Sequence, residues 1–140
     1  MNLLNSDGFW QFACTLYAKP EQQQTLLALQ NQQGKNVNLC LLLLYLDSLK
    51  LSLNADQLSA LIDSINEFDT QALKPLRAAR SYLKANQESI NDYAKIRQEL
   101  LSAELKLEKQ QQQILIDTAN KFSFLETVKP KNIELYVKAT

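Results

Sequence analysis

The residues best placed to do chemistry are four basic side chains that recur at helical spacing. At about 100° per residue they fall within a sector of roughly 120° on one side of a helix. No acidic residue lies between Asp69 and Glu88 to neutralise them. Two arginines about one turn apart can hold carboxylate or phosphate oxygens with forked hydrogen bonds. The spacing predicts an exposed binding surface for an anionic partner, the basic stripe, formed by Lys74, Arg77, Arg80 and Lys84.

The charge distribution offers a second interpretation of the basic stripe. Residues 1–70 carry three basic and seven acidic side chains, whereas residues 71–140 carry twelve and eight, so the net charges are −4 and +4. The stripe could therefore cover the core with its aliphatic stems and pair with the acidic first half. A total charge of zero gives no support for non-specific membrane or nucleic-acid binding. We expect a protein partner, with nucleic acid a less favoured alternative and no membrane partner.

A second candidate site joins Trp10, Tyr17 and Asn38. An asparagine in the first turn of a very apolar helix is unusual, because a buried amide needs hydrogen-bond partners. We expect a ligand pocket between the first and third helices, suited to a small phosphorylated or carboxylate molecule. The alternatives are that the aromatic residues are core and that Asn38 bonds a neighbouring backbone group.

Enzymatic chemistry has little support in the sequence. There is no histidine, and two glycines cannot supply a phosphate-binding loop, so the usual catalytic triads and zinc sites lack their parts. Asp63, Glu67 and Asp69 are expected on a solvated helix face beside a leucine stripe. We expect no catalytic residue, no metal and no cofactor.

The two cysteines and the hydropathy suggest the compartment. Cys14 and Cys40 lie among apolar residues, which favours buried free thiols over a disulfide. The first residues lack the pattern of a signal peptide. The longest apolar run, Leu39 to Leu46, is far shorter than the ~20 residues that span a bilayer. We expect a cytoplasmic protein.

The pattern of apolar residues predicts long helices joined by short turns. Helices are expected at about 6–19, 20–32 and 36–51, the last capped by Asn36. Residues 39–46 are apolar on every side of that third helix, so it belongs at the centre of a bundle.

The second half of the chain predicts one interrupted helix and one long helix. A helix opens at Asn54, and Pro75 is expected to kink or break it between Phe68 and Pro75. A long polar helix is expected at about 89–122, followed by a tail, 132–137, that forms a short helix or an extended arm. The predicted fold is all-α: a single domain over residues 1–140, with five to seven helices, a central apolar helix near 37–50 and the long helix near 89–122.

Three local patterns carry a resemblance to a known family. They are the aromatic first helix (Phe9-Trp10-Gln11-Phe12-Ala13, then Leu16-Tyr17), the helix start Gly34-Lys35-Asn36-Val37-Asn38-Leu39, and the basic segment from Pro75 to Lys84. Over roughly residues 6–84 the chain resembles a small proteobacterial family of short helical proteins known only as a domain of unknown function. The resemblance implies no activity, substrate or cofactor.

Taken together, the residues favour a non-enzymatic interaction or regulatory module that binds an acidic protein segment or nucleic acid through the basic stripe. The alternative function is binding of a small phosphorylated or carboxylate ligand near Trp10, Tyr17 and Asn38.

Overall fold

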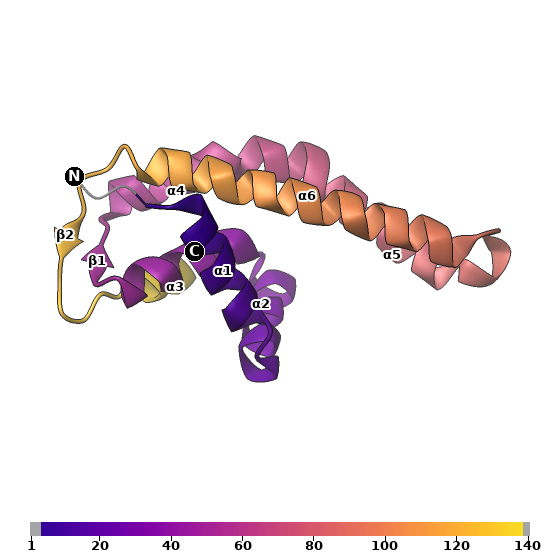
Figure 1. The fold of residues 1–140 in the computed structure, drawn as a ribbon, viewed down its shortest axis with the longest axis horizontal. Coiled ribbons are helices and arrows are strands. Elements are labelled where there is room, and N and C mark those ends of the chain that lie inside the picture. The colour runs from indigo at the N-terminus through magenta and orange to yellow at the C-terminus, as the bar shows by residue number, and fades with distance from the viewer. Residues whose placement is uncertain (1–3, 139–140) are drawn as a thin grey trace.

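The structure is a computed structural model that describes residues 4–138. Within this range the chain forms seven α-helices and one two-stranded antiparallel ribbon, which confirms the predicted all-α fold (Figure 1). The elements are α1 (Ser6–Tyr17), α2 (Pro20–Gln33), α3 (Val37–Ser48), β1 (Leu51–Ser52), α4 (Ala55–Phe68), a π turn (Asp69–Leu73), α5 (Lys74–Ala85), a 3₁₀ turn (Gln87–Ser89), α6 (Tyr93–Ala119), β2 (Leu125–Glu126) and α7 (Asn132–Lys138).

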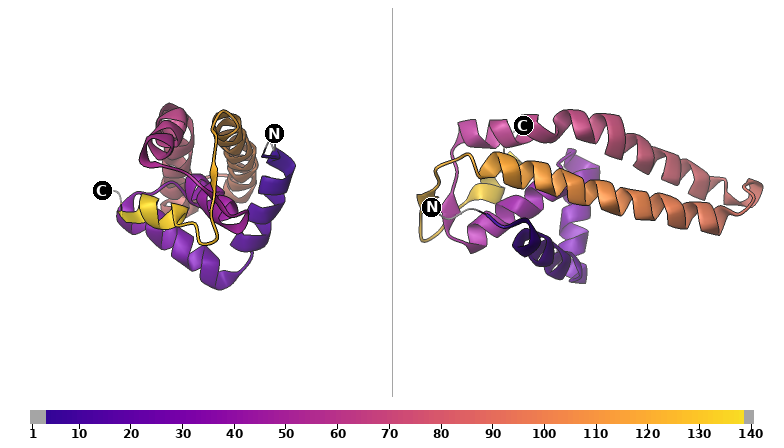
Figure 2. Two further views of the ribbon diagram at one scale, coloured as in Figure 1. Left: turned by 90° about the vertical axis from the view of Figure 1, so that its left-hand side faces the viewer. Right: turned by 45° about the horizontal axis from the view of Figure 1, so that its top comes forward.

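Two parts of different character make up the molecule. The continuous α4–α5 segment and α6 run side by side as a long antiparallel hairpin, and its far end extends beyond the rest of the fold (Figures 1 and 2). The remaining helices, α1, α2, α3 and α7, gather under the near end of this hairpin. We call residues 74–103 the arm and everything else in the described range the base.

Helix α3 is the centre of the base. Asn36 begins it, since its side-chain Oδ1 accepts a hydrogen bond from Leu39 N at 2.9 Å. The helix buries residues on all sides, including Leu39, Leu42 and Leu43 at 0% exposure. Phe9 of α1 is also fully buried and stacks on Tyr45 with ring centroids 5.6 Å apart. The predicted central apolar helix is confirmed.

Pro75 is accommodated by a widened helical turn. Proline lacks the backbone N–H of a regular helix and its ring collides with the preceding turn. The backbone responds with the π turn, in which Lys74 N–H bonds Asp69 O, five residues earlier. The regular α-helix is therefore interrupted by the π turn between Phe68 and Pro75, where a kink or a break was expected, and the chain continues directly into α5.

The widened turn also corrects the expectation that Asp69 is solvated. Buried residues recur at every fourth position along this segment, at Leu61, Ile65, Asp69 and Leu73. A regular helix with 3.6 residues per turn would have buried positions 68 and 72 instead. The extra residue in the turn moves Asp69 inward, and it is only 9% exposed.

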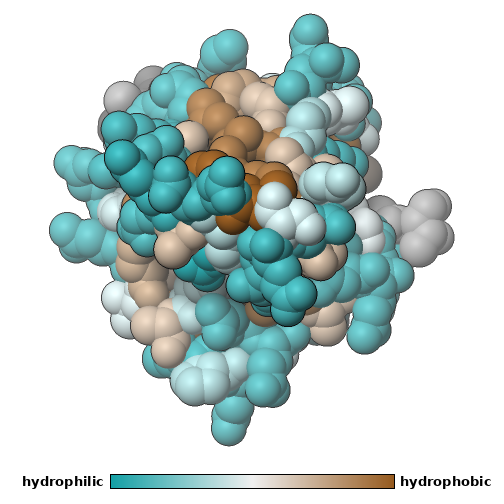
Figure 3. Space-filling view, turned by 90° about the vertical axis from the view of Figure 1, so that its right-hand side faces the viewer, coloured by the Kyte–Doolittle hydropathy of each residue, from teal (hydrophilic) through white to brown (hydrophobic). Residues whose placement is uncertain are grey.

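The long helix α6 passes through both parts of the molecule. It was predicted at 89–122, and it runs from Tyr93 to Ala119 after a 3₁₀ turn and a left-handed residue, Asp92. No residue of the arm is buried, whereas the basal half of α6 buries Gln111, Leu115 and Ile116 among others. Figure 3 views the molecule from the far end of the arm, where apolar side chains reach the surface in an upper central group surrounded by hydrophilic ones.

The tail closes the base as a short helix, one of its two expected forms. Asn132 is 1% exposed and holds this closure: its Oδ1 accepts from Leu53 N at 3.0 Å, and its Nδ2 donates to Leu51 O at 2.7 Å. Asn132 N donates to Asp47 Oδ1 at 3.0 Å. Among the described helices, none combines the length and the hydrophobicity that crossing a membrane requires.

Candidate functional site

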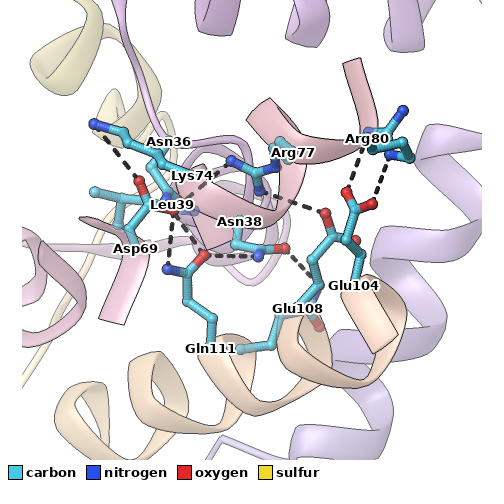
Figure 4. Close-up of polar contacts among 11 residues, drawn as sticks. Asn36, Asn38, Leu39, Asp69, Lys74, Arg77, Arg80, Glu104, Glu108 and Gln111 are labelled. Carbon is cyan, nitrogen blue, oxygen red and sulfur yellow. Dashed lines mark hydrogen bonds and ion pairs between the residues drawn. The ribbon is translucent and has the colours of Figure 1, made fainter. Parts of the chain in front are cut away.

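A chain of hydrogen-bonded side chains, the amide relay, crosses the base between α3, the π turn and α6 (Figure 4). Asp69 Oδ1 accepts from Gln111 Nε2 at 3.4 Å and from Asn36 Nδ2 at 3.3 Å. Gln111 Oε1 accepts from Asn38 Nδ2 at 2.9 Å, and Asn38 Oδ1 accepts from Gln112 Nε2 at 3.0 Å. The relay thus begins at a carboxylate and ends at Gln112.

The carboxylate sets the direction of every amide in the relay. An ionised carboxylate only accepts hydrogen bonds, so Gln111 must present its Nε2 to Asp69 and its Oε1 to Asn38. Asn38 then presents its Oδ1 to Gln112, and the Oε1 of Gln112 comes last. Gln112 is 6% exposed, and its Oε1 is the buried side-chain polar atom for which residues 4–138 provide no partner.

An unpartnered buried carbonyl is costly. A buried acceptor without a donor loses about 1–3 kcal/mol of hydration, and such groups in folded proteins point to a bound water, an ion or a functional site. The other amide groups of the relay are satisfied, so the demand for a donor is concentrated on Gln112.

The basic stripe lies beside the relay and is paired with carboxylates. Arg80 Nε and Nη2 donate to the two oxygens of Glu104 at 2.6 and 3.1 Å, and the Glu104 side chain is only 6% exposed. Arg77 lies between Glu108 Oε1, at 3.4 Å, and Asp69 Oδ1, at 3.8 Å. The two guanidinium groups are engaged within the fold.

The lysines of the stripe are more open. Lys74 Nζ lies 3.9 Å from Asp69 Oδ2, but its side chain is 65% exposed, and Lys84 is exposed on the arm. Pairing with the acidic first half therefore holds only at Asp69, because the other partners of the stripe, Glu104 and Glu108, belong to α6 in the basic half.

A cavity of about 440 Å³ adjoins the relay and the stripe. Its walls come from α1, α2, α3, α5 and α6, so segments distant in the sequence meet around it. It is lined by Trp10, Ala13, Cys14, Tyr17, Ala18, Gln23, Gln30, Val37, Asn38, Leu41, Arg77, Leu105, Glu108 and Gln112.

Desolvation alters the titration of two groups on the cavity wall. Burial raises the pKa of the Glu108 carboxyl, although the charge of Arg77 opposes the shift. Burial also raises the pKa of the Tyr17 hydroxyl, and the nearby charge of Glu108 adds to that effect. The wall is thus a partly dehydrated environment in which hydrogen bonds and charges interact more strongly than in water.

The cysteines differ from each other. Cys40 is fully buried in α3, and burial raises its pKa to about 12. Cys14 is exposed on α1 and lines the cavity, so the expectation that it is buried was wrong. Cys14 has apolar neighbours in the sequence, but it directly follows buried Ala13 on α1 and therefore points away from the core.

The structure brings together the three residues of the predicted pocket. Trp10, Tyr17 and Asn38 all line the same cavity, and Arg77 of the basic stripe lines it as well. Arg80 instead lies against Glu104, and neither Lys74 nor Lys84 reaches the cavity wall. Asn38 bonds two side-chain amides of the relay.

The glutamines of α6 are not among the site residues expected from the sequence. Gln111 is nevertheless fully buried, and Gln112 is nearly so. A signal was present, because Gln111 follows Leu107 by four residues and precedes Leu115 by four, and this spacing puts it in the buried seam.

A second hollow has a buried polar side chain whose hydrogen bonds are all made within the fold. It has a volume of about 460 Å³ and lies between β1 and α7. Its buried polar side chain, Asn132, already exchanges hydrogen bonds with Leu51 and Leu53. In the described part of the chain, no three or more cysteine, aspartate or glutamate side chains gather as a metal site would require.

Comparison with known proteins gives a family and no function. No curated protein and no solved structure matches the chain. A family model described as "Protein of unknown function (DUF2390)" matches residues 8–115. The matched region contains the whole amide relay and every residue that lines the cavity. The chain therefore belongs to the DUF2390 family of proteins of unknown function.

Proposed function

We propose that this protein is a non-enzymatic binding module that holds a small molecule in the cavity between α1, α2, α3, α5 and α6. The observation that carries the proposal is the cavity itself, in which apolar side chains meet the side chains of Asn38 and Gln112. Small-ligand sites are typically concave spaces of about 300–1,000 Å³ with apolar walls and a few convergent polar groups. A volume of about 440 Å³ falls within this range.

The cavity walls combine apolar and polar surface. Trp10, Leu41 and Leu105 offer apolar surface, and Asn38 and Gln112 offer a polar edge whose orientation the relay determines. Because the amides are already held in place, a bound molecule would not have to order them, and this preorganisation favours binding. The lack of histidine in the sequence is the basis for proposing binding rather than catalysis.

The basic stripe supports an anionic partner less well. Arg77 and Arg80 would have to leave Glu108 and Glu104 before they could bind a carboxylate or phosphate elsewhere. Release of Arg80 would leave Glu104 buried without its partner, which is costly. An acidic protein or nucleic acid on the stripe stays a prediction, and the exposed Lys74 and Lys84 are the residues on which it depends.

We further propose that the protein is cytoplasmic, and the family resemblance is the basis for proposing a bacterial source. Its two cysteines do not form a disulfide, which fits a reducing compartment.

The small molecules released from the purified protein test the proposed function. Leu105 lines the cavity and is 54% exposed, so Leu105→Trp should fill the cavity without entering the core. Leu125→Trp, at a site 75% exposed on β2, is the matched control. After unfolding, mass spectrometry should find a compound in wild type and in Leu125→Trp that is depleted from Leu105→Trp. Identical small-molecule contents in all three proteins would contradict the proposal.

Labelling of Cys14 provides a second readout. This thiol is exposed at the cavity wall, whereas Cys40 is buried with a pKa raised to about 12. N-ethylmaleimide should therefore modify Cys14 of the folded protein and leave Cys40 unmodified, because the thiolate is the reactive form. The compound found by mass spectrometry should slow this labelling when it is added back. An unchanged rate would place the compound outside the cavity.

A further inference from the structure

The α4–α5 segment carries opposite charges in its two halves. Residues 55–73 contain acidic side chains and no basic one, whereas residues 74–85 contain the basic stripe and no acidic one. The two halves follow each other directly along one side of α6 (Figure 1). The acidic side chains are Asp56, Asp63, Glu67 and Asp69. The segment is therefore a helical rod with a negative half and a positive half.

One face of this rod is exposed along its whole length. Exposed residues recur at every third or fourth position, and the π turn does not interrupt them. Tyr82 is the large hydrophobic side chain among them and is 66% exposed. The exposed face consists of Asp56, Ser59, Asp63, Glu67, Thr70, Lys74, Ala78, Tyr82 and Ala85.

The acidic side chains of the exposed face are not neutralised within the fold. Within residues 4–138, no ion pair uses Asp56, Asp63 or Glu67. Lys74 lies 3.9 Å from Asp69, but its side chain is 65% exposed and can reach outward. The exposed face thus presents negative charge on α4 and positive charge at the start of α5.

The charges of the exposed face are complementary to those of a second copy. A two-fold axis between positions 70 and 71 would place Glu67 opposite Lys74 of the second copy, and Lys74 opposite its Glu67. These contacts follow from the numbering, because 67 and 74 are equally distant from the axis. In such an isologous contact each favourable pair occurs twice.

The sizes of the side chains are complementary under the same axis. Tyr82 would lie opposite Ser59 of the second copy, and Asp63 opposite Ala78. The other end of the face would place Asp56 opposite Ala85, where the neighbouring Lys84 is exposed. Larger side chains therefore meet small ones, and no two like charges stand opposite each other.

Other partners fit the exposed face less well. A parallel arrangement of two copies would set Glu67 against Glu67, and like charges in contact are repulsive. A nucleic acid or a uniformly acidic protein segment would meet Asp56, Asp63 and Glu67 over half of the rod. A second copy of the chain supplies the opposite order of charges by symmetry.

We propose that the exposed face of the α4–α5 segment is an interface between two copies of this chain, aligned antiparallel about a two-fold axis next to Thr70. The segment is about 45 Å long at the rise of an α-helix. Exposed ion pairs contribute little each, so the dimer is weak and sensitive to salt. The inference is independent of the proposed function, because neither Glu67 nor Lys74 lines the cavity.

Sedimentation velocity of the wild-type protein tests whether the dimer exists. In about 0.1 M sodium chloride the sedimentation coefficient should rise with protein concentration as dimer forms. Raising the salt to about 1 M shortens the Debye length from roughly 10 to 3 Å, so association should weaken by about tenfold. A protein that stays monomeric in the lower salt at its highest soluble concentration would overturn the proposal.

Reversal of charge assigns the interface to the exposed face. Glu67→Lys or Lys74→Glu alone sets like charges opposite each other at both symmetric contacts, so each variant should self-associate about tenfold to a hundredfold more weakly. An equimolar mixture of the two variants restores opposite charges and should form a mixed dimer.

The matched controls make the same changes of charge elsewhere. Glu126 on β2 and Lys129 just after it are exposed, and both lie outside the α4–α5 segment. Glu126→Lys and Lys129→Glu should each dimerise as the wild type does. Self-association of Glu67→Lys at the wild-type strength would overturn the assignment to this face.

Disulfide trapping locates the two-fold axis. In a Cys14→Ser background, whose remaining Cys40 is buried, Thr70→Cys lies next to its own copy across the axis. Tyr82→Cys lies on the same face, about 35 Å from its own copy. Mild oxidation should link Thr70→Cys into a covalent dimer and leave Tyr82→Cys monomeric. If Thr70→Cys is linked no more efficiently than Tyr82→Cys, the antiparallel alignment is wrong.

Discussion

The base and the arm share helix α6 but differ in how their helices are packed. In the base, α3 is surrounded on all sides and Leu39, Leu42 and Leu43 are inaccessible to solvent. In the arm, α5 and the first half of α6 lie side by side, their far end projects beyond the other elements, and no residue is buried (Figure 1). The basal half of α6 shares the burial of α3, whereas its first half does not. Burial here is a property of the position along the hairpin rather than of the helix.

This difference explains where the polar chemistry gathers. Hydrogen bonds and ion pairs gain strength where water is excluded. The relay, the Arg80–Glu104 pair and the cavity all lie in the base or at its junction with the arm. The arm has few buried contacts, the condition under which a segment opens locally at low cost.

The largest expected effect contrasts a core leucine with an arm residue. Leu42→Ala should lower the free energy of unfolding by about 2–5 kcal/mol, because it leaves a cavity that α3 cannot collapse to fill. Ile96→Ala, on a partly buried face of the arm, should cost less than about 1.5 kcal/mol, since water already reaches the site. Urea unfolding of both variants checks the contrast. Equal losses would show that the arm is as tightly packed as the base.

The next effect concerns the ion pair at the junction. Arg80→Ala should destabilise the protein by about 1–3 kcal/mol, because it leaves the carboxylate of Glu104 buried without a partner. The value is lower than for a fully buried pair, since the Arg80 side chain is 31% exposed. Lys84→Ala, one turn further along the arm and exposed, should change stability by less than about 0.5 kcal/mol.

A double variant separates the pair from other effects of Arg80. Arg80→Ala combined with Glu104→Ala should recover part of the loss, because no unpaired charge then remains. If the two losses are simply additive, Arg80 does not stabilise the protein through Glu104.

How far the sequence predicts this molecule depends on the kind of interaction. The centre of the base followed from composition, because a helix that is apolar on every side has no surface to offer solvent. The starts of α3 and α4 followed from local capping by Asn36 and by Asn54 with Gln57. These features depend on neighbours in the sequence, so the sequence alone is sufficient for them.

The candidate site depends on contacts between residues far apart in the sequence, and the sequence predicts only some of its members. Trp10, Tyr17 and Asn38 line one cavity, as the expected closeness of the first and third helices predicts. Gln112 was not identified, because nothing nearby in the sequence indicates that Asn38, 74 residues earlier, would bond it. Asp69 was misplaced because the regular helical period fails at the π turn.

The smallest effect is a dependence on pH at the cavity wall. Burial raises the pKa of Glu108 above its ordinary value of 4.5, so the folded state holds this proton more tightly than the unfolded state. The contribution of Glu108 to stability is therefore full at low pH and declines as the pH rises from about 4.5 through the raised pKa. Its side chain is 37% exposed, and screening keeps the decline below about 1 kcal/mol.

Replacing the carboxyl isolates that decline. Glu108→Gln should lose less stability than wild type between pH 4.5 and 7, as measured by urea unfolding at each pH. Asp47, whose pKa burial also raises, contributes to both proteins and cancels in the comparison. A steeper decline in Glu108→Gln would reverse the sign and contradict the assignment.

The central claim is that a small molecule occupies the cavity that Trp10, Asn38 and Leu105 line, and a crystal structure of the protein purified without added ligand tests it most directly. The account predicts electron density for a non-protein molecule in contact with Trp10 and Asn38. A cavity that holds only ordered water, in protein from which mass spectrometry releases no compound, would contradict the claim.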